Sequence, residues 1–313
     1  MENDISFIGL GQMGYGMALN VRKKLSPTAK MFINDINAAA CERFVAESSE
    51  YGPVEIVASA KDAASKSNIL ISIVPASQHV RQVYLDEANG VVAAPKNDSR
   101  LILESSTIDV DTTREVGKAI MDAGLGRYVD SPVSGGVSGA AAGKLAFMIG
   151  CPPEDPKAEL ILEIVAMMGA KEKLFLCGQL GNGLAAKISN NYLSGTNLLA
   201  LSEAMAFGIR AGVDKEILAK VIHASSGSSW MADNLNPVPD ILPNAPSSNG
   251  YKATFRHEMI VKDLGLGVDA AKKHNVVPRM GNVAIEQYKA AAKNPKLEGK
   301  DFTSIYLHIT EEE

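Results

Sequence analysis

The chain has 313 residues, 46% of them apolar and 21% charged, and its formal net charge is −5. This composition is typical of a soluble globular protein, and the length suits two domains better than one. The net negative charge argues against a nucleic-acid partner, and no apolar run reaches the roughly 20 residues that would span a membrane. Five histidines without ligand spacing and three widely spaced cysteines predict neither a metal site nor a disulfide framework.

Short apolar runs alternate with helical stretches through the first half of the chain. The predicted strands are ISFIGL, KMFIND, VEIVAS, ILISIV, RLILESS, RYVDSPV, KLAFMIG and KLFLCG. Such runs, separated by helices, are typical of parallel strands buried on both faces of a sheet. We therefore expect residues 1–180 to form a Rossmann-type doubly wound α/β domain in which all these strands extend one sheet.

The sequence changes character after residue 180. From Gly183 to Ala211 it runs without proline and is rich in small and apolar residues, which predicts one long helix buried nearly all round. One subunit alone hardly covers such a helix, so we expect it to pack against another subunit. Further helices are predicted at 214–226, 257–274 and 279–293. A Pro- and Asn-rich loop of about twenty residues, expected to be functional or mobile, lies within this all-α domain of residues 181–313.

A glycine-rich turn follows the first predicted strand. FIGLGQMG places Gly9, Gly11 and Gly14 in GxGxxG spacing, with Leu10, Gln12 and Met13 between them. The pattern alone is weak, but here it follows a strand and opens a helix, which is the setting in which glycines let backbone approach a pyrophosphate. The alternative is a tight strand-to-helix turn that binds nothing.

Three other strand ends point to the same nucleotide site. Asp35 ends the second strand, about twenty residues past the last glycine, where a carboxylate accepts hydrogen bonds from the adenosine ribose and repels a 2′-phosphate. No arginine stands beside it in the sequence, so we predict NAD rather than NADP; the alternative is a turn or helix-cap aspartate. Val74 and Pro75 follow the fourth strand and Thr107 follows the fifth, although Thr107 also fits the cap of the next helix.

Two further motifs fit the binding and chemistry of a substrate. Ser134, Gly135 and Gly136 leave the sheet where backbone N–H groups and a hydroxyl can hold a carboxylate, unless they form only a flexible loop. In GNGLAAKISNN, Lys187 and Asn191 are four residues apart and share a helix face. A desolvated lysine has a lowered pKa and suits general acid–base catalysis on a hydroxyl or carbonyl. The alternative is a lysine whose head reaches the surface.

These motifs carry a resemblance that covers the whole chain. FIGLGQMGYGMALN, DSPVSGG, GNGLAAKISNN and KDLGLG occur in the order and spacing of the β-hydroxyacid dehydrogenases. In the second domain SSGSSW, NPVPDILPNAPSSNGY and DFTSIYLHITEEE resemble the 3-hydroxyisobutyrate dehydrogenase branch. The resemblance implies an oxidoreductase of valine catabolism that oxidises 3-hydroxyisobutyrate to methylmalonate semialdehyde with NAD. It also implies a homodimer or homotetramer assembled through the helical domain.

The resemblance also implies a role for individual residues. Lys187 corresponds to the catalytic general acid/base. The substrate-binding positions are Ser134, Gly135, Gly136, Asn191, Trp230 and Asp263. The cofactor-binding positions are Gly9, Leu10, Gly11, Gln12, Met13, Gly14, Asp35, Val74, Pro75, His79, Thr107 and Lys262.

This chain departs from the family pattern in places. Arg256 and His257 stand where smaller, less charged residues are expected, and position 79 is His instead of Asn; both places are expected near the cofactor or the pocket. A presequence found in animal relatives is missing, so the chain as written is expected in the cytoplasm, or in mitochondria if a presequence was trimmed. The three cysteines suit a reducing compartment.

Three other functions compete with this one. An NADPH-dependent reductase of glyoxylate or a small semialdehyde is disfavoured by Asp35, and a decarboxylating sugar-phosphate enzyme by the lack of a basic cluster. An NAD-binding sensor without catalysis is disfavoured because Lys187, Asn191 and the Ser-Gly-Gly run occur together.

Overall fold

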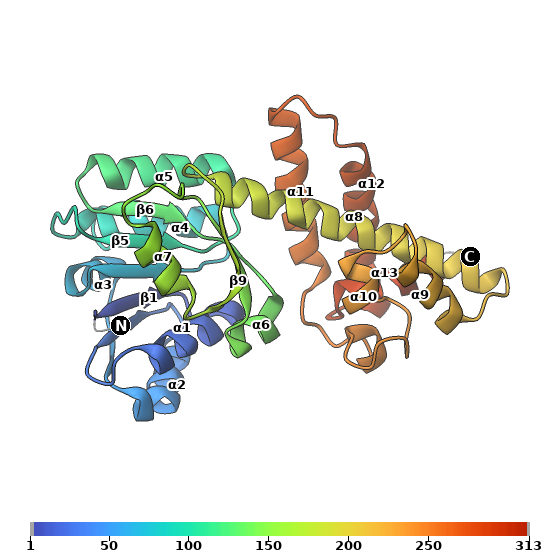
Figure 1. The fold of residues 1–313 in the computed structure, drawn as a ribbon, viewed down its shortest axis with the longest axis horizontal. Helices are drawn as coiled ribbons and strands as arrows, with labels where there is room; N and C mark the ends of the chain where they lie inside the picture. The colour runs from blue at the N-terminus through green and yellow to red at the C-terminus, as the bar shows by residue number, and fades with distance from the viewer. Residues whose placement is uncertain (1–2, 312–313) are drawn as a thin grey trace. The chain divides into compact units, whose positions relative to one another are not determined.

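The computed structural model describes residues 3–311 and divides into two compact units, Met1–Lys187 and Ile188–Glu313. The first unit combines a β-sheet with helices, and the second is helical (Figure 1). None of the described helices is long and apolar enough to cross a membrane. Cys41, Cys151 and Cys177 are all free thiols.

A six-stranded parallel sheet organises the first unit. Its strands are β1 (Ile5–Ile8), β2 (Met31–Asn34), β3 (Val54–Ile56), β4 (Ile69–Ser72), β5 (Leu101–Glu104) and β6 (Arg127–Asp130), in the order β3-β2-β1-β4-β5-β6. The intervening helices are α1 (Gln12–Lys24), α2 (Ala38–Ser48), α3 (Ala60–Lys66), α4 (Ser77–Leu85) and α5 (Val110–Asp122). The strand order reverses between β1 and β4, which is where doubly wound folds bind nucleotides. The predicted Rossmann-type domain is confirmed.

The prediction that all the strands extend one sheet is wrong. β7 (Val133–Ser134), β8 (Leu145–Ile149) and β9 (Gly169–Leu176) form a separate three-stranded sheet. The reason is the short connection after β6: only two residues separate β6 from β7, whereas a parallel neighbour needs a crossover of a dozen or so residues. β7 therefore pairs antiparallel with β8, and α6 (Gly136–Ala142) and α7 (Ala158–Val165) flank the new strands.

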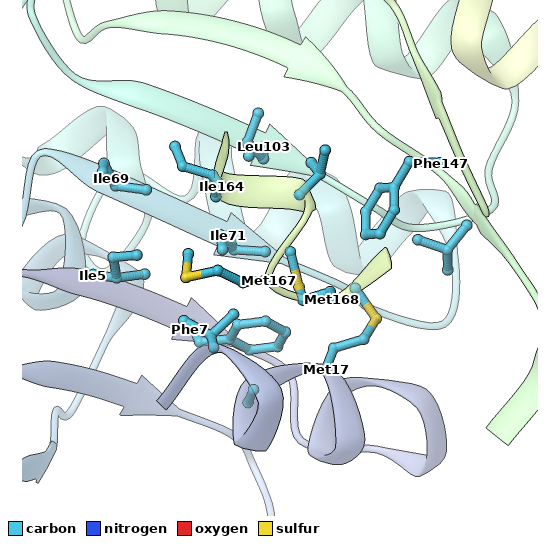
Figure 2. Close-up of a cluster of buried hydrophobic side chains, with 14 of the residues drawn as sticks. Ile5, Phe7, Met17, Ile69, Ile71, Leu103, Phe147, Ile164, Met167 and Met168 are labelled. Carbon is cyan, nitrogen blue, oxygen red and sulfur yellow. The ribbon is translucent and has the colours of Figure 1, made fainter. Parts of the chain in front are cut away.

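One hydrophobic core joins the two sheets of this unit. Figure 2 shows Ile5, Phe7, Ile69, Ile71 and Leu103 of the main sheet facing Met17 of α1, Phe147 of β8, Ile164 of α7, and Met167 and Met168. Nearly all of these side chains are fully buried, and each contributes about 1.5–3 kcal/mol relative to exposure. The second sheet and α7 thus cover the α1 side of the main sheet. Because β9 is the last strand before the long helix that follows, this packing also places the start of that helix.

The long helix α8 (Asn182–Arg210) begins in the first unit, and its residues after Lys187 form the central helix of the second unit. The other helices are α9 (Lys215–Ala224), α10 (Trp230–Asn234), α11 (His257–Lys273), α12 (Arg279–Lys293) and α13 (Ile305–Glu311). Leu198, Leu201 and Met205 of α8 are buried in the helical core, whereas Leu193 and Phe207 are 58% and 69% exposed. The nearly complete burial expected for this helix is therefore not reached within one chain.

The loop between α10 and α11 is tied down by hydrogen bonds. Tyr251 donates its hydroxyl to the carbonyl of Pro237 at 2.8 Å, and Ser247 donates to the carbonyl of Asn236 at 2.7 Å. The buried carboxylate of Asp301 accepts hydrogen bonds from Thr254 and Phe255 at the end of the loop. The loop is thus an ordered part of the helical unit.

Candidate functional site

The glycine turn after β1 has the geometry of a dinucleotide-binding turn. Gly9 has φ +97°, and a Cβ there would lie 2.0 Å from the carbonyl oxygen of Ile73. A Cβ on Gly14 would lie 2.0 Å from the carbonyl oxygen of Gly9, so both outer glycines are required by packing. A Cβ on Gly11 would meet nothing within 4 Å, and no side chain caps α1 there. Open space therefore lies against the uncapped helix N-terminus, where a pyrophosphate can bind.

Asp35 lies beside this turn at the end of β2. Its Oδ2 accepts a hydrogen bond from the backbone N–H of Leu10 at 2.5 Å, and its Oδ1 accepts one from Asn37 at 2.7 Å. Each carboxylate oxygen has two lone pairs, so both can still accept a bond from a ribose hydroxyl. The residues present thus fit the adenosine half of a nucleotide.

A cavity of about 630 Å³ opens at the same turn. Its walls include Leu10, Gly11 and Gln12, and also Asn37 and Arg43 of the α2 region. Arg43 was missed by sequence reasoning, which found no arginine near Asp35. The signal was its helical spacing, since Ala39 and Ala40, which also line the cavity, precede Arg43 by four and three residues and share its face of α2.

Arg43 is already engaged within the chain. Its guanidinium lies 4.0 Å from the centroid of the Tyr15 ring, and its Nε lies 3.8 Å from Glu47. The Tyr15 hydroxyl donates to Glu47 at 2.6 Å, which closes the cluster. Burial and the bond to Glu47 raise the pKa of the Tyr15 hydroxyl.

The ends of β4 and β5 are joined by side-chain bonds. The hydroxyl oxygen of Ser106 accepts a bond from the backbone N–H of Val74 at 2.7 Å. Ser77 donates to Asp109 at 2.6 Å, and Asp109 caps α5 by accepting from the N–H of Thr112 at 2.7 Å. Thr107 is therefore not the cap of α5. Burial opposes ionisation of Asp109, but these bonds outweigh it and lower its pKa.

Two of the predicted cofactor residues beyond β4 differ in exposure. Pro75 is exposed, and His79 on α4 is half-buried. Nδ1 of His79 is buried without a hydrogen-bond partner among the described residues. An orphaned buried nitrogen at this sheet edge fits a site that a ligand completes.

The predicted substrate loop starts on β7. Ser134 pairs with Ala146 of β8, and Gly135 and Gly136 follow with φ +136° and +64°, backbone conformations that favour glycine. A Cβ on Gly136 would meet nothing within 4 Å, so the backbone there borders open space.

The helix that follows this loop is fastened to α1, the helix that opens at the glycine turn. Gly16 lets the helices touch, because a Cβ on it would lie 2.9 Å from the backbone nitrogen of Ala141. Asn20 donates to the carbonyls of Ala140 and Ala141 at 2.9 and 3.1 Å. Sequence reasoning missed both positions, although their spacing of four residues places them on one face of α1.

Lys187 is the last residue of the first unit and lies on α8. It is buried, at 7% exposure, which does not fit a lysine whose head reaches the solvent. Asn191 follows four residues later on the same helix and is also buried.

Asn191 is held by α11 within the second unit. Its Nδ2 donates to Oδ2 of Asp263 at 2.7 Å, and Asp263 is itself buried. Nζ of Lys262 lies 3.9 Å from the other carboxylate oxygen of Asp263. Three predicted residues of the second unit are therefore brought together. Trp230, at the start of α10, is 63% exposed.

His257 is a buried residue of α11, and its expected place near the cofactor or pocket stays a prediction. It is 2% exposed, and its Nε2 lies 2.9 Å from the hydroxyl of Ser304 in the core of the helical unit. Burial lowers its pKa to about 4. Arg256 is exposed, and its backbone pairs with that of Asp301 in an isolated antiparallel β-bridge. No group of three or more metal-ligating side chains occurs among residues 3–311.

The first unit, with its open glycine turn and strand-end aspartate, defines a dinucleotide-binding oxidoreductase class. Residues 4–178 match the family described as the NAD binding domain of 6-phosphogluconate dehydrogenase. Residues 181–309 match the family described as NAD-binding of NADP-dependent 3-hydroxyisobutyrate dehydrogenase. The mitochondrial 3-hydroxyisobutyrate dehydrogenase of Rattus norvegicus is 36% identical over 312 residues, which cover all of this chain and 88% of that protein.

A serine dehydrogenase and a solved 3-hydroxyisobutyrate dehydrogenase structure are also similar to this chain. An NAD-dependent L-serine dehydrogenase of Pseudomonas aeruginosa is 36% identical over 306 residues and is covered to 96%, as is this chain. The solved structure of a Mycobacterium tuberculosis 3-hydroxyisobutyrate dehydrogenase with L-serine superposes with a TM-score of 0.85 at 30% identity, with 99% of each chain covered. The chain therefore belongs to the β-hydroxyacid dehydrogenase family, in which its likeness to the 3-hydroxyisobutyrate dehydrogenases is confirmed.

Proposed function

We propose that this protein oxidises 3-hydroxyisobutyrate to methylmalonate semialdehyde with NAD, as a step of valine breakdown. The observation that supports this most is the buried Lys187, four residues before the buried Asn191 on α8. The spacing of four residues puts Lys187 and Asn191 on the same face of α8, and their burial keeps both side chains away from bulk solvent. In this proposal residues 1–180 form the dinucleotide-binding domain, and residues 181–313 form the helical domain that contributes to the substrate site and mediates oligomerisation.

The chemistry assigned to Lys187 is proton transfer. As the neutral amine it takes the proton of the substrate hydroxyl, while the hydride on the same carbon leaves with its electron pair and a carbonyl forms. Bound nicotinamide supplies the acceptor for that hydride. In the reverse direction the Lys187 ammonium returns the proton to the carbonyl oxygen. Asn191, oriented by Asp263, holds the reacting oxygen of the substrate.

The substrate carboxylate is assigned to the loop after β7. Ser134 offers a hydroxyl, and Gly135 and Gly136 offer backbone N–H groups that border open space. Trp230 and Asp263 are assigned to the pocket wall. An acid with a carboxylate and a hydroxyl on carbon 3 satisfies both the loop and Lys187.

NAD is proposed over NADP. Gly9, Leu10, Gly11, Gln12, Met13 and Gly14 would hold the pyrophosphate, with Asp35 at the ribose and Val74, Pro75, His79, Thr107 and Lys262 at the nicotinamide half or the remaining cofactor surface. Asp35 would repel a 2′-phosphate. Arg43, the basic side chain in the cavity wall, is already stacked on Tyr15 and paired with Glu47.

L-Serine is a second candidate substrate. It also carries a carboxylate and a hydroxyl on carbon 3, and two of the similar proteins are named for it or with it. The difference between the two acids is an amino group in place of a methyl group, so the residues around carbon 2 decide between them.

Self-association through the helical unit is also proposed. Leu193 and Phe207 on α8 and Ile217 and Val221 on α9 are more than half exposed, a concentration of large apolar side chains that favours burial against a second copy. A reducing compartment inside the cell suits the three free thiols.

A panel of small acids tests the proposed function. 3-Hydroxyisobutyrate, L-serine and 3-hydroxypropionate are assayed with NAD and NADP, and glyoxylate and methylmalonate semialdehyde with NADH and NADPH. We expect the highest kcat/KM for 3-hydroxyisobutyrate with NAD. A higher kcat/KM for L-serine would make serine the assigned substrate. Exclusive reduction of glyoxylate with NADPH would reject the proposed dehydrogenase function.

A further inference from the structure

The start of α8 lacks a cap of its own. The residue before the helix is Gly181, which has φ +89° and no side chain that could accept a hydrogen bond from the first turn. The first turn of a helix leaves backbone N–H groups that need an acceptor, and a Ser, Thr, Asn or Asp at the cap usually supplies it. At the start of a helix of 29 residues this need is met by another part of the chain.

Asp130, the last residue of β6, supplies both acceptors. Its Oδ1 accepts a hydrogen bond from the N–H of Gly181 at 2.7 Å, and its Oδ2 accepts one from the N–H of Leu184 at 2.8 Å. Leu184 is the third residue of α8, the position that a cap side chain normally satisfies. The carboxylate is fully buried, and its negative charge faces the positive end of the helix dipole.

Two glycines make room for this contact. A Cβ on Gly150 would lie 1.8 Å from Oδ1 of Asp130. A Cβ on Gly183 would lie 2.3 Å from the carbonyl oxygen of Met148 and 2.9 Å from Oδ2 of Asp130. The first turn of α8 therefore packs closely against β8 and against the carboxylate of Asp130, so it has little freedom to shift.

The same residue stands beside the substrate loop. Asp130 precedes Ser134 by four residues, and its backbone carbonyl accepts a bond from Gly150 at 2.8 Å, which ties β6 to the end of β8. Lys187 follows Leu184 by three residues, which is nearly one helical turn. Asp130 thus connects the strand that leads into Ser134 with the helix turn that carries Lys187.

We propose that Asp130 is a positioning residue that fixes the start of α8 and thereby the place of Lys187 in the nucleotide-binding unit. It touches neither substrate nor cofactor in this role. The catalytic part of the inference rests on the proposed function, whereas the anchoring of the helix does not. Burial raises the pKa of Asp130, and the two N–H groups act against that effect.

Asp130→Asn tests the anchoring without adding bulk. An amide has one acceptor oxygen, so its NH2 group must face one of the two backbone N–H groups. In the full-length protein without ligands, we expect hydrogen exchange of the amides at 181–187 to rise by about tenfold or more, while amides of α1 keep their wild-type rates. An unchanged exchange rate at 181–187 would refute the proposal.

The effect of Asp130→Asn on catalysis is measured as its kcat and its Kd of NAD. We expect kcat for the hydroxyacid, per NAD-binding enzyme, to fall by about 10²-fold with the Kd of NAD within about twofold of wild type, because small misplacements of a catalytic group are costly. Added primary amines should restore part of the turnover of Lys187→Ala but none of that of Asp130→Asn, because the amine is still present. Faster exchange with unchanged kcat would overturn the positioning role.

Two controls and a second variant separate positioning from general damage. Asp301→Asn removes a second fully buried carboxylate that accepts backbone N–H groups, and it should lower thermal stability while kcat stays within about twofold. If Asp130→Asn does not fold, Gly183→Ala displaces the same helix start by steric contact and should also lower kcat. Its control is Gly265→Ala on α11, where a Cβ meets nothing within 4 Å.

An inactive wild type would separate the two proposals. Absence of turnover with every acid and both cofactors would reject the proposed function. The exchange measurement would still decide whether Asp130 holds the start of α8, because it requires no substrate.

Discussion

The side-chain amide of Asn191 donates a 2.7 Å hydrogen bond to Asp263, and both residues are buried. Asn191 is thereby held in one orientation, with its NH2 group towards α11. Asp263, which the resemblance assigns to the substrate site, is also the hydrogen-bond partner that orients Asn191. An amide fixed in this way can bind an oxygen without first losing rotational freedom.

Asn191→Ala should raise KM for the hydroxyacid by about tenfold or more and also lower kcat, because an interaction with the reacting oxygen is lost. Asp263→Asn should give a smaller effect of the same kind, since Asn191 keeps a polar neighbour but loses a charged acceptor. Steady-state kinetics at saturating NAD measure both. Wild-type constants in Asn191→Ala would remove this residue from the substrate site.

We expect the choice between NAD and NADP to depend on Asp35. Asp35→Ser should lower kcat/KM for NAD by about tenfold and raise it for NADP, because the carboxylate at the ribose is lost. Adding Arg43→Ala should abolish the gain with NADP, if Arg43 is the group that meets a 2′-phosphate in the cavity. Initial rates with both cofactors measure these effects, and a wild-type preference for NADP would contradict the assignment.

Acid should destabilise the helical unit through His257. The native protein binds this proton with a pKa of about 4, whereas the unfolded chain binds it at 6.5. The unfolded state therefore holds more protons between these values, so stability is complete above pH 6.5 and falls as the pH drops towards 4. The loss amounts to about 3 kcal/mol from this group alone.

Denaturant unfolding at several pH values measures this effect. In His257→Gln, which cannot titrate, the slope of stability against pH between 6.5 and 4 should be shallower. The same slope in the variant and the wild type would show that other groups cause the acid sensitivity.

Charges on the exposed faces of α8 should break the proposed assembly. Leu193→Glu with Phe207→Glu should shift the protein towards monomer, because burying two carboxylates in an apolar interface costs several kcal/mol. Phe175→Glu on β9, which is also about half exposed, is the matched control and should leave the assembly intact. Sedimentation or light scattering measures the mass. A monomeric wild type would contradict self-association.

The sequence predicted the Rossmann sheet because its strands are apolar runs with a strong βαβ rhythm, which local composition reveals. It failed for β8 and β9, since β8 and the end of β9, residues 174–176, are apolar runs like those of the main sheet. The two-residue connection between β6 and β7 is too short for a parallel pairing of these two strands, and so short a loop carries little signal in the sequence.

The sequence predicted the glycine turn and the shared helix face of Lys187 and Asn191, because each depends on residue types at a short fixed spacing. The chemical roles of Lys187 and Asn191 stay predictions. Residues that act over long sequence distances were missed: Asn20 bonds Ala140 and Ala141, and Asp130 bonds Gly181 and Leu184. Such partners are set by tertiary packing, so no local pattern marks them.

The turnover of Lys187→Ala with 3-hydroxyisobutyrate and NAD tests whether Lys187 is the general acid/base. The exposed Lys220 on α9 provides the control variant Lys220→Ala, which should keep wild-type kinetics. We predict that Lys187→Ala loses about 10³-fold or more in kcat, while titration gives a Kd of NAD within about threefold of wild type. Turnover within about tenfold of wild type, with NAD binding intact, would contradict the assignment of Lys187 as the general acid/base.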